Sequence, residues 1–135
     1  MKKLLKVAVV LLAICTMFVA CVSKPVAGTE GAWKLTCYAG TMNGWNPGEA
    51  LVDNSFSFTA TGSDEFKFTD GSWGLTAVCD PIDALDTEIP LSGFGDTGYT
   101  NIVFADGVLI PGVDYCVTIE IYGEEEAYVI VSEIE

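Results

Sequence analysis

Apolar residues in this chain recur at every second position within short segments, and turn residues separate the segments. Residues 55–60 place Phe56 and Phe58 between serines and threonines, and residues 114–122 alternate in the same way. Asp-Gly and Asn-Gly dipeptides lie between such segments, and no apolar pattern of helical period reaches ten residues after residue 31. Period-two patterning broken by tight turns is typical of antiparallel strands. The sequence therefore predicts an all-β domain over residues 32–135.

The predicted fold is an antiparallel β-sandwich of immunoglobulin-like topology with seven or eight strands, after an N-terminal signal helix. Seven strands are expected at residues 32–39, 55–60, 65–69, 72–78, 100–105, 114–122 and 126–134. In the first strand, Trp33, Leu35 and Cys37 are expected to face the core. In the third, Lys67 is expected to point outward. Residues 79–90 are expected to form a long acidic loop with at most one helical turn at 82–85, and residues 91–98 to be irregular.

Composition excludes several classes of function. The chain has no histidine and no arginine, and its formal net charge is −13. Without residues 1–20 the balance is three lysines against nineteen acidic residues, a net charge of −16. A surface this acidic repels nucleic-acid backbones. The absence of histidine removes the usual general base and most zinc chemistry.

The N-terminus has the pattern of an export signal. Residues 1–6 are basic, and residues 7–20 form an apolar run of fourteen, which is short for a membrane-spanning helix. Phe18-Val19-Ala20-Cys21 then resembles a bacterial lipobox, with Phe18 where leucine is usual. The resemblance implies a lipoprotein signal peptide over 1–20, acylation of Cys21, a lipidated tether over 21–31, and a bacterial cell envelope location, on the outer membrane. The alternative is an ordinary signal peptide in which Cys21 has no role.

Three cysteines remain in the domain after Cys15 and Cys21 are assigned to the signal and the lipid. Cys37, Cys79 and Cys116 allow either one disulfide with one free thiol or three free thiols. Cys79 is the most adaptable partner because it lies in the predicted loop. The alternation of strand residues makes a Cys37–Cys116 bridge less natural.

Two of the three tryptophans lie beside glycines in turn-rich stretches. Trp45 follows Asn43-Gly44, Trp73 follows Gly71-Ser72, and Lys67 lies on the strand between them. Exposed indole faces stack on the C–H faces of pyranose rings, while amides and lysines bind the hydroxyls. The pattern therefore indicates a shallow site for a polar ligand. The alternative is that both tryptophans cover the ends of the sandwich core.

Three segments together are similar to the immunoglobulin-like starch- and glycogen-binding modules. They are G-T-M-N-G-W-N at 40–46, E-F-K-F-T-D-G-S-W at 65–73 and T-N-I-V-F at 100–104. These modules include the glycogen-binding module of the AMP-activated protein kinase β-subunit and domains of outer-membrane starch-utilisation lipoproteins. The similarity covers roughly residues 37–134. It implies that the two tryptophans stack on glucose and that a lysine and a later asparagine bind its hydroxyls, here Trp45, Trp73, Lys67 and Asn101.

The resemblance implies a lipid-anchored, non-catalytic module that binds an α-glucan without a cofactor or metal. The alternative is a structural or protein-interaction lipoprotein of the envelope with the same fold and no affinity for sugar. A calcium site in the acidic loop is a weaker hypothesis that involves Asp80, Asp83, Asp86 and Glu88. Glycoside hydrolysis is disfavoured, because a domain of this size has little room for a deep cleft between paired carboxylates.

Overall fold

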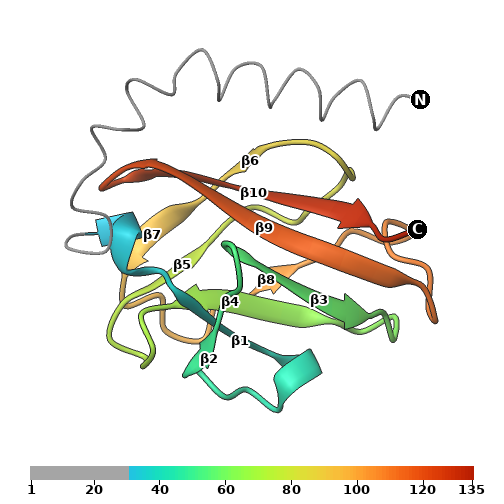
Figure 1. The fold of residues 1–135 in the computed structure, drawn as a ribbon, viewed down its shortest axis with the longest axis horizontal. Coiled ribbons are helices and arrows are strands. Elements are labelled where there is room, and N and C mark those ends of the chain that lie inside the picture. The colour runs from blue at the N-terminus through green and yellow to red at the C-terminus, as the bar shows by residue number, and fades with distance from the viewer. Residues whose placement is uncertain (1–30) are drawn as a thin grey trace.

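The computed structural model describes residues 31–135, which form two antiparallel β-sheets packed as a sandwich (Figure 1). The described elements are η1 (Gly31–Lys34), β1 (Cys37–Gly40), η2 (Thr41–Asn43), β2 (Glu49–Ala50), β3 (Ser55–Thr59), β4 (Glu65–Thr69), β5 (Thr76–Val78), β6 (Ile89–Pro90), β7 (Ser92–Gly95), β8 (Ile102–Val103), β9 (Asp114–Gly123) and β10 (Glu126–Glu133). The predicted all-β sandwich is confirmed, and its immunoglobulin-like topology stays a prediction. The predictions for the signal peptide, Cys21 and the tether up to residue 30 lie outside the described residues.

β4 is the central strand of the first sheet. The strand order is β2-β1-β4-β5-β7, and β8 also pairs with β4. Phe66 of β4 lies opposite Gly40 of β1 and Ile102 of β8. Side chains alternate along a strand, so Phe66 and Phe68 point toward the second sheet while Lys67 between them points to the outer face. The strand that carries Lys67 is thus held from both sides.

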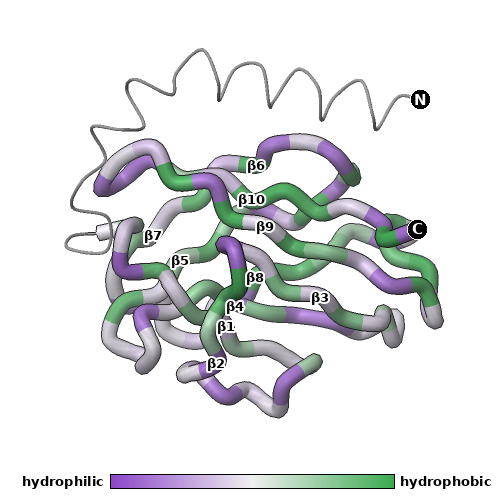
Figure 2. Tube along the Cα trace, in the orientation of Figure 1, coloured by the Kyte–Doolittle hydropathy of each residue, from purple (hydrophilic) through white to green (hydrophobic). Residues whose placement is uncertain are grey.

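The second sheet is built on the long hairpin of β9 and β10. Its strand order is β3-β9-β10-β6, and the hairpin register runs from Tyr115 opposite Glu133 to Gly123 opposite Glu126. Every second residue of β9 is buried, which confirms the alternation predicted for this segment. The buried residues are Tyr115, Val117, Ile119 and Ile121. In Figure 2 hydrophobic residues alternate with more polar ones along both strands, and hydrophilic residues gather at the hairpin tip.

Aromatic rings fill much of the space between the sheets. Tyr38 stacks on Phe56 with ring centroids 3.9 Å apart and planes 4° apart. Phe66 meets Phe56 edge to face at 5.3 Å, and Phe66 and Phe68 are completely buried. Such pairs add ~0.5–1.5 kcal/mol each beyond the burial of apolar area. This packing fixes the position of β4 against the second sheet.

The first predicted strand is wrong in its extent, and of its three predicted core residues only Leu35 is buried, at 1% exposure. η1 occupies its first residues, and only β1 is extended. Tyr38 faces the core, whereas Cys37 is half-buried on the outer face. Trp33, predicted as a core residue, is only partly buried and packs against the edge of the core. The 3₁₀ turn rotates the chain by about a third of a turn per residue, so the alternation does not carry through it into β1.

Every one of the seven predicted strands overlaps an observed strand, whereas β2, β6 and β7 were not predicted. β6 pairs with β10 and β7 pairs with β5, so residues 79–98 are more regular than expected. The helical turn suggested for 82–85 does not form. Instead Ile82 donates its N–H to Val103 O and accepts from Ala105 N, both at 2.9 Å. Both backbone polar groups of Ile82 therefore pair with residues in and just after β8, which prevents a helical turn here.

The three cysteines of the described domain are free thiols, and each is half-buried. The sequence allowed either one disulfide with one free thiol or three free thiols, and the structure has three free thiols. Burial, with a smaller contribution from the Asp80 carboxylate, raises the pKa of the Cys79 thiol to about 12. Cys79 is therefore a packed apolar residue and not a reactive nucleophile.

Candidate functional site

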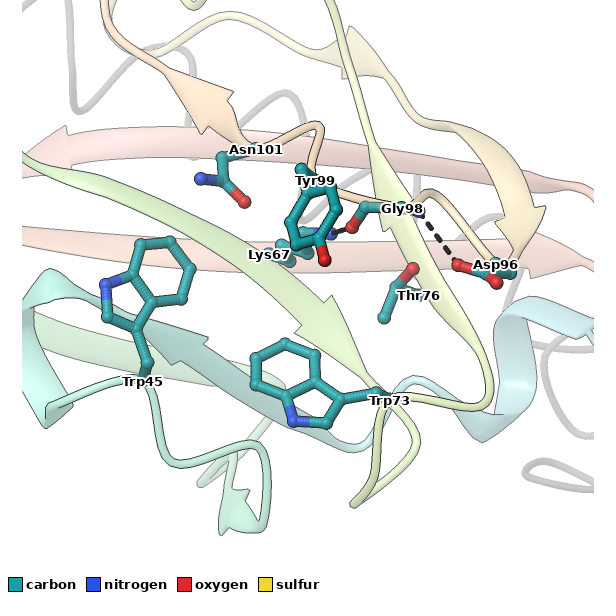
Figure 3. A pocket seen from close by; sticks show the side chains of 8 residues that line it. All are labelled: Trp45, Lys67, Trp73, Thr76, Asp96, Gly98, Tyr99 and Asn101. Carbon is teal, nitrogen blue, oxygen red and sulfur yellow. Dashed lines mark hydrogen bonds between the residues drawn. The ribbon is translucent and has the colours of Figure 1, made fainter.

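A pocket of about 570 Å³ lies on the outer face of the sheet that contains β4 (Figure 3). Its lining residues are Trp45, Lys67, Trp73, Thr76, Asp96, Gly98, Tyr99 and Asn101. The four residues that the resemblance selected come from three separate segments of the chain, and the structure brings all four into this one pocket. In Figure 3 the two indoles lie along one side of the pocket, and Asn101 and Tyr99 lie along the other.

The side chain of Asn43 holds the loop that carries Trp45. Its Oδ1 accepts hydrogen bonds from the amides of Gly40 and Asn46, at 2.9 and 3.3 Å. Its Nδ2 donates to the carbonyls of Tyr38 and Asn46, at 3.2 and 3.0 Å. Because this side-chain amide both donates and accepts hydrogen bonds, it satisfies backbone groups that have no regular strand pairing in the loop. The Asn-x-Trp pattern therefore has a structural cause that does not depend on a ligand.

The same loop needs a glycine at position 40 and strains the backbone at position 45. A Cβ on Gly40 would lie 2.6 Å from the carbonyl oxygen of Glu65 and 2.7 Å from the Cβ of Phe66. β1 can therefore approach β4 this closely only where it lacks a side chain. Trp45 has φ of 61°, and its N–H donates to Gly40 O at 2.9 Å. The left-handed conformation costs a bulky residue ~1–3 kcal/mol, so the surrounding loop must impose it.

A tight turn between β4 and β5 presents Trp73. Asp70 Oδ1 accepts from the amide and the hydroxyl of Ser72, at 3.0 and 2.9 Å, and Ser72 Oγ accepts from Gly74 N at 3.1 Å. The amide of Asp70 donates to Leu75 O at 3.1 Å and closes the turn. Partial burial acts to raise the pKa of Asp70, but hydrogen bonds from Ser72 and from backbone amides outweigh it and lower the pKa. The Trp73 side chain is left 48% exposed.

Lys67 points outward from the core, as predicted, but it is not on the open surface. It is only 4% exposed, because residues 96–99 cover it. Its Nζ donates to the carbonyl of Gly98 at 2.6 Å and to Thr97 Oγ1 at 3.0 Å. Burial lowers the pKa of Lys67, and the carboxylate of Asp96 opposes part of this effect. The strand pattern gave the direction of this side chain correctly, but the covering loop comes from a distant part of the chain.

Two threonines complete the wall around Lys67. The hydroxyl oxygens of Thr76 and Thr97 are 2.6 Å apart, and Thr76 Oγ1 also donates to Gly95 O at 3.0 Å. Thr76 is 2% exposed, so this is a buried polar network at one end of the pocket. Buried polar groups that satisfy one another make the local structure rigid.

Asn101 lies at the opposite edge of the pocket, just before β8. Its Nδ2 donates to Glu65 Oε1 at 3.0 Å, which fixes the orientation of the amide. The carbonyl oxygen of this amide is not used in that bond. Asn101 can therefore accept a hydrogen bond from a ligand hydroxyl in the pocket.

Sequence reasoning missed four lining residues, Thr76, Asp96, Gly98 and Tyr99. Tyr99 is the most exposed large hydrophobic side chain of the described domain, with a relative exposure of 102%. One signal could have found it. Gly98-Tyr99 repeats the pattern of Gly44-Trp45, a glycine of positive φ followed by an aromatic residue in a turn.

The chemistry of the lining suits binding. Lys67 and Asp96 are its two charged side chains, and it holds one carboxylate where a standard glycoside hydrolase uses two. Within residues 31–135 no group of three or more acidic or cysteine side chains could hold a metal ion. The acidic loop considered for calcium therefore lacks such a group, and its Asp86 accepts a hydrogen bond from Ser132 Oγ at 2.7 Å.

Comparisons of the chain with protein families, with curated proteins and with solved structures find no match. Within the described residues, no helix has the length and apolarity needed to cross a bilayer.

Proposed function

We propose that this domain is a non-catalytic carbohydrate-binding module and that its ligand is an α-glucan. The observation that carries the proposal is the meeting of Trp45, Lys67, Trp73 and Asn101 in a single pocket. Three separate sequence segments, residues 40–46, 65–73 and 100–104, supply them. The resemblance to immunoglobulin-like starch- and glycogen-binding modules forms part of this proposal.

The size and lining of the pocket support a sugar ligand. A volume of about 570 Å³ lies within the usual range for small-ligand sites. Two indole faces give a pyranose ring apolar surface on which to stack, while the Asn101 carbonyl can accept from a hydroxyl. The net charge of −13 disfavours anionic ligands, so a neutral glycan fits the electrostatics best.

We further propose that the module is a lipoprotein of the bacterial envelope, anchored through Cys21 on the outer membrane. Support comes from the signal-like pattern of residues 1–20 and from the resemblance of residues 18–21 to a lipobox. The chain enters the domain at a defined point, because the amide of Ala32 donates to the carbonyl of Glu124 at 2.7 Å. Residues 23–31 of the proposed tether over 21–31 would reach ~30 Å if extended, so the pocket would stay close to the lipid surface.

Affinity electrophoresis of the domain in gels that contain glycogen or amylopectin tests the binding proposal. The wild-type domain should be retarded, and Trp73→Ala should abolish most of the retardation, because an exposed turn residue can be truncated without loss of the fold. Tyr128→Ala is the matched control, since Tyr128 is an aromatic residue on the outer face of the other sheet. Unretarded migration of the wild-type domain at high polysaccharide content would disprove α-glucan binding.

A second candidate function is contact with another envelope protein. The exposed rings of Trp73 and Tyr99 favour it, because aromatic residues at a pocket rim also suit protein interfaces. A pull-down from detergent-solubilised envelope, with and without maltooligosaccharide, separates the two functions. A partner retained despite the competitor, together with no retardation by glucan, would replace the first proposal with the second.

A further inference from the structure

We propose that Tyr99 is a third aromatic contact for the ligand and that Lys67 is a positioning residue that holds the Tyr99 loop. The inference rests on the proposed function and deepens it. In the starch- and glycogen-binding modules that the sequence resembles, the lysine at this position binds sugar hydroxyls. The contacts of Lys67 in this chain assign it a different role.

The exposure of Tyr99 needs an explanation. Large apolar side chains that are exposed within residues 31–135 are Val52, Trp73, Tyr99, Ile110 and Ile134. Only Trp73 and Tyr99 of this set line the pocket. Figure 3 shows the Tyr99 ring standing beside the pocket, across from the two indoles. A ring presented in this place adds a stacking surface opposite the tryptophans.

The residue before Tyr99 is bound at both of its backbone polar groups. The amide of Gly98 donates to Asp96 Oδ1 at 2.9 Å, and its carbonyl accepts from Lys67 Nζ at 2.6 Å. Gly98 has φ of 61°, a left-handed conformation that directs the chain toward Tyr99. The amide of Thr100 donates to Thr97 O at 3.2 Å and closes the turn. The direction of the Tyr99 ring therefore depends on the bonds at Gly98.

Lys67 is well suited to hold this loop and poorly suited to bind sugar directly. It lies on the central strand of its sheet and is 4% exposed. Two of its three N–H groups donate to Gly98 O and to Thr97 Oγ1. A hydroxyl that took either donor would leave a loop acceptor without its partner, which weakens the net gain from the new bond. The carbonyl of Asn101 is the more accessible hydrogen-bonding group.

A double-mutant cycle distinguishes positioning from direct contact. Retardation by glycogen is measured for Tyr99→Ala, Lys67→Met and the double variant, with Tyr99→Phe as the conservative variant. Tyr99→Ala should weaken binding about 10-fold, as expected for loss of one stacking ring, and Tyr99→Phe should bind like the wild type. Lys67→Met should weaken binding to a similar extent. The double variant should be no weaker than the weaker single variant.

Additive losses, about 100-fold in the double variant, would show that Lys67 contacts the ligand by itself and would overturn the positioning role. Amide hydrogen exchange without ligand gives a second readout, because the hydrogen-bonded amides of Gly98 and Thr100 should exchange faster in Lys67→Met if Lys67 holds the loop. Unchanged exchange at these amides would also overturn that role. If Lys67→Met does not fold, Asp96→Ala replaces it in the cycle, since Asp96 is exposed and binds the other side of Gly98.

The test separates this inference from the proposed function. A wild-type domain that binds glycogen, with Tyr99→Ala equally retarded, would overturn the role of Tyr99 and leave the proposed function intact. A wild-type domain that glycogen does not retard would overturn the proposed function and the ligand contact of Tyr99 together. The exchange measurement would still decide whether Lys67 holds the loop.

Discussion

The two loops that carry Trp45 and Trp73 are held in place by different interactions. Around Trp45, the neutral amide of Asn43 makes four hydrogen bonds to the backbone, and Gly40 allows close contact with β4. Around Trp73, the carboxylate of Asp70 accepts from Ser72 in an exposed turn. The first loop is a packed part of the sheet edge, and the second is a local turn between paired strands.

The difference indicates how each indole depends on the rest of the fold. The Trp45 loop is held by contacts with β1 and β4 and by the hydrogen bonds of the Asn43 side chain. A change there should therefore lower the stability of the whole domain. The Trp73 turn is stabilised within six residues, so a change there should stay local. The pocket thus combines one wall that is coupled to the core with one that is nearly independent of it.

The largest effect is expected for Gly40→Ala. Its side chain would meet the backbone of Glu65 and the Cβ of Phe66, so the free energy of unfolding should fall by ~3 kcal/mol or more. Urea denaturation measures this change. Gly44→Ala is the matched control, because a Cβ there meets nothing within 4 Å and only its φ of 69° is unfavourable. Equal losses in both variants would show that the close approach at Gly40 is not the cause.

Asn43→Ala should come next. It removes four hydrogen bonds and leaves the buried side of the loop without partners, which costs about 2 kcal/mol. Binding should fall with stability, because the strained φ of 61° at Trp45 is no longer imposed. Denaturation and glycogen retardation should be measured on the same samples. Wild-type stability in this variant would contradict the idea that the loop is coupled to the core.

Asp70→Ala should change the free energy of unfolding by less than about 1 kcal/mol, since the turn is partly exposed and lies between paired strands. The free energy of glycogen binding should fall by more than the free energy of unfolding, because the Trp73 indole loses its fixed direction. Thermal unfolding and retardation give the comparison. A loss of stability equal to that of Asn43→Ala would remove the distinction between the two loops.

The smallest effect concerns pH. The pKa of Asp70 is lowered from its ordinary value of 3.8 in the folded protein, so its contribution to stability is fully present above pH 3.8. That contribution is lost as pH falls through the lower folded value. Amide resonances of Ser72 should shift in this acidic range, whereas those of Asn46, which donates to the neutral Asn43, should not follow the same titration. Asp70→Asn should remove the shift at Ser72.

Local pattern predicted the strands whose residues alternate strongly. Phe56, Phe58 and the inward residues of β9 are buried as expected, because a two-sheet sandwich gives each such strand one core face. Prediction failed where the backbone is bent or pairs over only two residues. The 3₁₀ turn of η1 moved the buried face of the entry strand from Cys37 to Tyr38, and the two-residue strand β6 has too little sequence to show a period.

For the candidate site, the sequence by itself determined the turn chemistry that presents Trp45 and Trp73 and the outward direction of Lys67. Glycines, amides and short polar side chains act over a few residues, so their effect can be read locally. Only the tertiary structure decided that Asn101 joins the tryptophans, that Tyr99 stands across from them, and that a loop thirty residues away covers Lys67. These relations depend on strand order within the sheet, which no local pattern encodes.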